Sequence, residues 1–255
     1  MMNAQTPHKK LMATGAIKLD LDAPKPGPVA KRPFAASSFT LSDPAKIPPR
    51  AFVYGRHLIR KQVSVTVAPG GLGKSSLTLV EAMAMATGRP LVGQSVNAPL
   101  RVWLWNLEDP REELDRRAAA IAQHFGITNE CIGGRLFMDT GREQELCTAV
   151  VTGKDGAVLQ EPVIDRLIDE LNSKRIDVLI VDPFISSHQV SENDNPAMDM
   201  VAKAWARVAD HANAAISLVH HTRKARPQTA RPTPTAHAAR RRWSMPQGTF
   251  AASPA

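Results

Sequence analysis

Residues 68–75 read Ala-Pro-Gly-Gly-Leu-Gly-Lys-Ser, and this stretch decides the fold. The apolar run at residues 63–67 predicts a buried strand before it, and residues 75–82 predict a helix after it. The three glycines let the backbone wrap around an anion, and the helix N-terminus adds its positive dipole end. Strand, glycine loop and helix in this order predict a loop that holds the phosphates of a nucleotide.

The individual loop positions have separate expected roles. Lys74 would reach the β- and γ-phosphates and support catalysis, and Ser75 would place its hydroxyl on Mg²⁺. The usual pattern begins with Gly where this chain has Ala68, which tolerates most backbone conformations except positive φ. The bland alternative is a glycine-rich turn before a helix. We expect ATP to contact Ala68, Pro69, Gly70, Gly71, Leu72, Gly73, Lys74, Ser75 and Ser76.

Length and composition place limits on the class of protein. The chain has 255 residues, of which 43% are hydrophobic, and this suggests one main domain with a substantial core. No run approaches the roughly 18 apolar residues of a membrane-spanning helix, and the N-terminus lacks an apolar signal core. We therefore expect a cytoplasmic protein that does not contact a membrane. Cys131 and Cys147, the two cysteines, are expected to be core thiols.

The net charge of +8 is concentrated at the C-terminus. Residues 223–255 hold seven of the 32 basic residues and no acids, so 25 basic and 24 acidic residues remain in residues 1–222. A basic tail could be an electrostatic arm for DNA or RNA. The body of the chain is nearly neutral.

The sequence divides into three regions. Residues 1–50 are proline-rich without a clear period and predict a flexible leader. Residues 51–222 alternate strands with helices, which predicts an α/β domain with a mostly parallel sheet covered by helices on both faces. Residues 223–255 predict a disordered tail. Further strands are expected at residues 100–105, 177–181 and 214–219, and helices at 110–125, 164–171 and 196–212.

Acidic residues end two of the expected strands. Asp182 follows a fully apolar strand, where a carboxylate would hold Mg²⁺ beside the phosphate loop. Glu108 and Asp109 follow residues 103–105 in the same way, and Glu108 is the better candidate to polarise an attacking water. Asp109 precedes Pro110 and could cap the next helix. The alternatives are purely structural roles: Asp182 starts a turn, and residues 108 and 109 both cap the helix expected at residues 110–125.

Two adjacent histidines, His220 and His221, end the last expected strand. A polar residue there could contact the γ-phosphate. No third ligand accompanies them, so we do not expect a zinc site. In the preceding helix, Met198, Val201, Trp205 and Val208 recur at spacings of three and four, which predicts ordinary core packing.

These motifs, taken in order, resemble the RecA-like ATPases of the RepA hexameric helicase type over about residues 48–224. The matching stretches are residues 65–75, 105–110, 180–183 and 220–224, with residues 192–195 resembling the loop after the Mg²⁺ aspartate. The resemblance implies a ring-forming ATPase, often from plasmid or phage replication modules, that moves on single-stranded DNA. It implies that Glu108 is the catalytic base, Asp182 the Mg²⁺ acid and His221 a γ-phosphate sensor. Leu107 stands where many relatives have a small residue.

The tail departs from this family. After Lys224 the family continues with a strand pair whose Arg-Gly-small-small stretch supplies an arginine to the neighbouring subunit's ATP, and no such stretch follows here. Back-translation of residues 237–254 in another frame permits Arg-Gly-Ala-Ala-Ala-Leu-Val-Asp-Ala-Ala-Arg-Asp-Val-Arg-Ser-Leu, which resembles the missing ending. We hypothesise that the reading frame shifts between about Lys224 and Arg231, in which case the basic tail says nothing about DNA.

Three interpretations follow from the sequence. The first is an ATP-hydrolysing RepA-type replicative helicase that forms a homo-oligomeric, hexameric ring if its C-terminus is intact. The second is a nucleotide-binding regulator or recombination-type ATPase without unwinding activity. The third is a truncated remnant that binds ATP but lacks the arginine acting in trans.

Overall fold

The computed structural model describes residues 35–153 and 156–222. The expected tail, and all of the expected leader before residue 35, lie outside the described residues. The chain separates into two compact units, Met1–Pro48 and Pro49–Ala255. The described part of the first unit holds the short 3₁₀-helix η1 (Pro44–Lys46), and Asp43 caps it by accepting a hydrogen bond from the Ala45 amide. All described strands and α-helices belong to the second unit.

A five-stranded, fully parallel sheet forms the centre of this unit, with strand order β3-β9-β8-β4-β5. Two antiparallel pairs, β1 with β2 and β6 with β7, lie outside it. The central strands are β3 (Val63–Pro69), β4 (Val102–Asn106), β5 (Leu136–Thr140), β8 (Val178–Asp182) and β9 (Ala215–Thr222). The smaller pairs are β1 (Phe52–Tyr54), β2 (Leu58–Ile59), β6 (Ala149–Thr152) and β7 (Gly156–Leu159).

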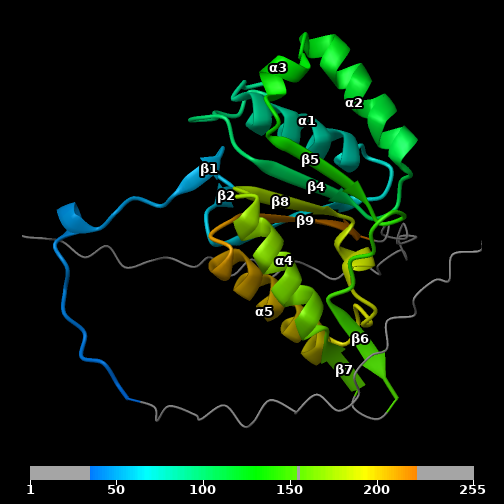
Figure 1. The fold of residues 1–255 in the computed structure, drawn as a ribbon. Coiled ribbons are helices and arrows are strands. Elements are labelled where there is room, and N and C mark those ends of the chain that lie inside the picture. Colours follow the sequence, from blue (N-terminus) through cyan, green and yellow to red (C-terminus); the bar gives the residue numbers. More distant parts are fainter. Residues whose placement is uncertain (1–34, 154–155, 223–255) are drawn as a thin grey trace, which may run out of the picture. The chain divides into compact units, whose positions relative to one another are not determined.

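Helices cover both faces of the sheet, as expected from the alternation of strands and helices (Figure 1). α1, α2 and α3 lie on one face, and α4 and α5 lie on the other (Figure 1). Their bounds are α1 (Lys74–Thr87), α2 (Arg111–Phe125), α3 (Asn129–Ile132), α4 (Glu161–Ser173) and α5 (Asn195–His211), with a 3₁₀-helix η2 (Phe184–Ser187) after β8. The predicted α/β class is therefore confirmed.

The inner strands β4 and β8 are buried along their whole length because both of their sides pack against helices. In β8, Leu179 and Val181 belong to the core on the α4 and α5 side, whereas Val178 and Ile180 belong to the core on the α1 side. The stripe predicted on α5 is also confirmed: Trp205 is only 1% exposed, and Val201 and Val208 are equally buried. These two cores hold the strands in the register that forms the site.

The structure tests the expectations for the two cysteines and for a membrane-spanning helix. Cys131 and Cys147 are partly exposed and unpaired, so the prediction that they are core thiols is wrong. Cys131 lies in the short surface helix α3, and Cys147 lies in the loop before β6. Among the helices of the described ranges, none is long and apolar enough to cross a membrane.

Candidate functional site

The phosphate loop joins β3 to α1 with the backbone that its glycines permit. Gly71 and Gly73 have φ of +80° and +79°, a left-handed conformation that favours glycine. Gly73 is the N-cap of α1 and offers no side chain, so the first amides of this helix are not capped from within. Ala68 lies in β3 and outside the left-handed region, so alanine suits the backbone at the start of the loop.

Lys74 is the first residue of α1 and its ammonium group folds back over the loop. Nζ donates hydrogen bonds of 2.7 Å to the carbonyl oxygens of Ala68 and Pro69. The residue is 7% exposed. Within the described residues no carboxylate lies within ion-pair distance of Lys74. A buried ammonium without a counter-charge favours the binding of an anion.

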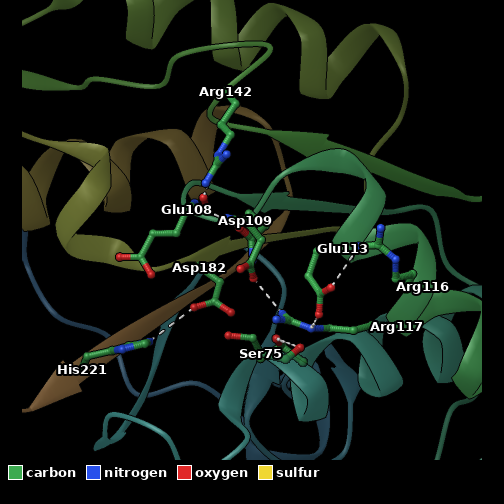
Figure 2. Close-up of polar contacts among 11 residues, drawn as sticks. Ser75, Glu108, Asp109, Glu113, Arg116, Arg117, Arg142, Asp182 and His221 are labelled. Atoms are coloured by element: carbon green, nitrogen blue, oxygen red, sulfur yellow. Dashed lines mark hydrogen bonds and ion pairs between the residues drawn. The ribbon is translucent and has the colours of Figure 1, made fainter.

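Asp182, the last residue of β8, is a buried acidic residue that also lacks a strong partner. It is 1% exposed, and neither carboxylate oxygen has a hydrogen-bond partner in the described part of the chain. Burial raises the pKa of Asp182, while the Ser75 hydroxyl and the His221 ring act to lower it. Ser75 and Asp182 lie beside one another at the start of α1 and the end of β8 (Figure 2). A buried carboxylate with free oxygens beside a hydroxyl fits Mg²⁺, which prefers oxygen ligands.

In the turn after β4, the two acidic candidates Glu108 and Asp109 differ in their contacts. Asp109 is held in place, because its Oδ2 accepts a 2.7 Å hydrogen bond from Arg117 and a 3.2 Å hydrogen bond from the side-chain Nδ2 of Asn106. The Glu108 carboxylate is exposed and has no hydrogen bond to another described residue, and it points to the side on which Asp182 and His221 lie (Figure 2). Helix α2 has Pro110 at its N-cap and no side-chain cap, so the alternative that residues 108 and 109 cap it is wrong.

The two histidines of β9 have different neighbours, as alternation along a strand requires. The Nε2 atom of His221 lies 3.6 Å from Oδ1 of Asp182. The Nδ1 atom of His220 lies 3.4 Å from Oε1 of Glu192, in the loop between η2 and α5. His221 is thus the histidine that faces Asp182 at the end of β8.

Strand register explains why these residues meet. Ala68 pairs with His221 across β3 and β9, and Asn106 pairs with Asp182 across β4 and β8. All four strands are parallel, so their carboxyl ends lie at one edge of the sheet, where open α/β sheets place their sites. Lys74, Ser75, Glu108, Asp182 and His221 therefore gather at that edge.

Sequence reasoning did not single out Asn106 or Gly141, which shape the turn that carries Glu108. The Oδ1 atom of Asn106 accepts hydrogen bonds from the amides of Glu108 (3.0 Å) and Asp109 (2.7 Å). An Asn directly after a strand is a turn signal and could have been recognised. Gly141 carries no such signal, because its contact partner depends on the pairing of β5 with β4.

A cavity of about 610 Å³ lies elsewhere, at Trp103, Trp105 and Phe137 beside α4. No residue of the phosphate loop lines it. Neither Lys74 nor Asp182 lines it, so this cavity is not the candidate nucleotide site.

The comparisons with known proteins agree with this geometry. The family model AAA_25, described as "AAA domain", matches residues 30–227. The chain belongs to this family of RecA-like P-loop ATPases, which includes RepA-type helicases. No curated protein matched the chain. Membership in the AAA domain family supports nucleotide binding and an ATPase activity.

Proposed function

We propose that this AAA domain binds ATP with Mg²⁺ at the loop of residues 68–76 and hydrolyses it to ADP and phosphate. One observation carries the proposal: Lys74 and Asp182 are a buried cation and a buried anion at one edge of the sheet, and neither is neutralised by a strong partner in the described residues. A ligand that brings both phosphates and a divalent cation satisfies both charges at once.

The roles of the side chains follow from their positions. The loop amides and Lys74 hold the β- and γ-phosphates, and Ser75 and Asp182 hold the metal ion. Mg²⁺, when bound, neutralises charge that develops on the phosphate oxygens. Glu108 orients a water and accepts its proton as the water oxygen bonds to the γ-phosphorus and the bond to the β–γ bridging oxygen breaks. His221 contacts the γ-phosphate and senses its presence.

We propose further that the hydrolysis drives a RepA-type replicative helicase that forms a ring, with six subunits expected, on single-stranded DNA. The support is the family, which includes RepA-type helicases, together with the gathering of Lys74, Glu108, Asp182 and His221 at one sheet edge.

ATP turnover with and without single-stranded DNA tests this proposal, combined with strand displacement and the mass in solution. We expect Mg²⁺-dependent turnover that DNA stimulates, displacement of a paired strand, and a mass several times that of the 27.7 kDa chain. Turnover without any displacement would refute the helicase and leave the ATPase. No turnover and no ATP binding would refute the site.

A second candidate is an ATP-binding protein that cannot form an active ring. The observation that favours it is the position of β3, which has β9 as its one partner strand in the described part of the sheet. Val65 and Val67 of β3 are each 54% exposed, unusual for a strand of a parallel sheet. A strand contributed by a family-type ending would cover such an edge.

The proposed frame shift links this edge to the tail, whose residues 223–255 lie outside the described part of the chain. Determining the nucleotide sequence of the gene tests the shift, and a sequence that cannot encode the alternative ending would refute it. A frame-restored protein is then expected to regain turnover, since an arginine supplied in trans contributes about 10³- to 10⁵-fold in related enzymes. Equal turnover of both proteins would contradict the second candidate.

A further inference from the structure

The Glu108 side chain has no hydrogen-bond partner of its own among the described residues, so the backbone of its turn sets its direction. Three contacts fix that turn from the inside. The Asn106 side chain is 3% exposed and binds the amides of Glu108 and Asp109, and the Leu107 amide donates a 2.7 Å hydrogen bond to the Asp182 carbonyl oxygen.

The end of the neighbouring edge strand β5 fixes the same turn from the outside. The Gly141 amide donates a 2.8 Å hydrogen bond to the Asn106 carbonyl oxygen. The Arg142 Nε atom donates a 3.1 Å hydrogen bond to the Glu108 carbonyl oxygen, a contact that is visible in Figure 2. The two residues that follow β5 therefore hold the backbone on both sides of Leu107.

Gly141 allows this approach because it has no side chain. A Cβ atom there would lie 2.8 Å from the Leu107 carbonyl oxygen and 2.9 Å from its Cα, both closer than real contacts allow. These are backbone atoms, which cannot rotate away as the end of a side chain can. The φ of Gly141 is outside the left-handed region, so the close contact and not the conformation requires glycine.

We propose that Gly141 is a positioning residue for Glu108: its lack of a side chain lets the end of β5 hold the backbone turn that aims the Glu108 carboxylate. The proposal rests on the role of Glu108 in ATP hydrolysis proposed above. A displacement of about 1 Å in a catalytic group can cost about 10²-fold in rate, so a clash at Leu107 is sufficient to matter. Gly141 acts through the backbone and does not touch substrate.

Gly141→Ala tests the proposal in the full-length chain. We expect kcat for ATP to fall by about 10- to 100-fold, with KM and ATP affinity within about twofold of the parent. Gly153→Ala is the matched control, because that glycine also has φ outside the left-handed region and no atom lies within 4 Å of an added Cβ. This control should keep the parental kcat.

The Glu108→Gln background separates positioning from a general structural role. If Gly141 acts through Glu108, Gly141→Ala should cause no further loss of kcat in that background. An equal loss in both backgrounds, or a parental kcat for Gly141→Ala, would overturn the proposal. An unimpaired Glu108→Gln protein would refute both this inference and the proposed base, whereas an impaired Glu108→Gln with an intact Gly141→Ala refutes the inference alone.

If Gly141→Ala does not fold, Arg142→Ala tests the same positioning of the Glu108 turn. Arg142 is exposed, so truncation of its side chain leaves the core unchanged. Loss of its single hydrogen bond to the Glu108 carbonyl should lower kcat by about 2- to 10-fold without changing ATP affinity. A parental kcat for Arg142→Ala, with Gly141→Ala unfolded, would overturn the proposal.

Discussion

The Nε2 atom of His221 lies 3.6 Å from Oδ1 of Asp182, across the carboxyl ends of β9 and β8. It is the one ion-pair contact that Asp182 makes in the described residues, and a histidine is charged only when protonated. Asp182 is therefore a buried carboxylate whose neutralisation is weak in the protein alone. The cost of burying it is explained if the residue binds a cation during function.

The replacement Asp182→Asn should make the protein more stable and less active. It removes a buried charge, and we expect the melting temperature without nucleotide or Mg²⁺ to rise by ~2 °C or more, equivalent to ~1 kcal/mol. Mg²⁺-dependent ATP turnover should be lost. Differential scanning fluorimetry and a phosphate-release assay measure the two effects.

Asp177→Asn is the matched control, since Asp177 precedes the same strand. Its Oδ1 pairs with Arg60 at 2.7 Å, and its Oδ2 accepts a hydrogen bond from the Arg101 amide. This variant should lower the melting temperature and preserve turnover. A melting temperature lowered equally by both replacements would contradict the account of Asp182.

Stability should depend on pH through Glu81 of α1, whose pKa is shifted by burial. Burial raises the pKa of Glu81 above its ordinary value of 4.5. His57, with Nε2 4.0 Å away, and Tyr54 face this carboxyl, and burial lowers the pKa of His57. The folded state then binds the Glu81 proton more tightly than the unfolded state. Its stabilising contribution is complete below pH 4.5 and is lost as the pH rises through the raised pKa.

The variant Glu81→Gln removes this titration. The melting temperature of the variant minus that of the parent should therefore increase from pH 4.5 upward and become constant once the pH exceeds the raised pKa. Melting curves between pH 4.5 and 8 measure the difference. A difference that does not change with pH would refute the interpretation.

Trp205 should be the most costly core position on α5. It is 1% exposed, and its Nε1 atom has no hydrogen-bond partner among the described residues. We expect Trp205→Ala to reduce the free energy of unfolding by ~3–5 kcal/mol, and Trp205→Phe by less, because Phe fills more of the space and removes the unpaired N–H. Urea denaturation compares them, with Val151→Ala on β6 as an exposed control. A Phe variant as unstable as the Ala variant would contradict this.

The parts of the fold that depend on local sequence could be predicted. β3, the glycine loop and α1 are contiguous, and each has a pattern that is specific by itself. The apolar stretches of β4, β8 and β9 were found within one or two residues at most ends, with β9 continuing through Thr222. Parallel strands have their carboxyl ends at one edge, and at that edge His221 pairs with Ala68 and lies 3.6 Å from Asp182.

The parts that depend on pairing between distant residues could not. β5 lies at the sheet edge and ends in Asp139 and Thr140, so it has only three apolar residues in a row. Without β5 there was no reason to connect Gly141 with Leu107. The distinction between Glu108 and Asp109 likewise depends on Arg117, eight residues further along on α2, whose direction the sequence does not specify.

The most direct test of the central claim is the binding and turnover of ATP with Mg²⁺ by Lys74→Ala, compared with the parent by titration calorimetry and phosphate release. Lys203→Ala, whose lysine is exposed on α5 and paired with Asp199, is the matched control. We predict that Lys74→Ala loses ATP binding or lowers turnover by ~10²- to 10³-fold, while Lys203→Ala retains both. Parental binding and turnover in Lys74→Ala would contradict the assignment of residues 68–76 as the nucleotide site.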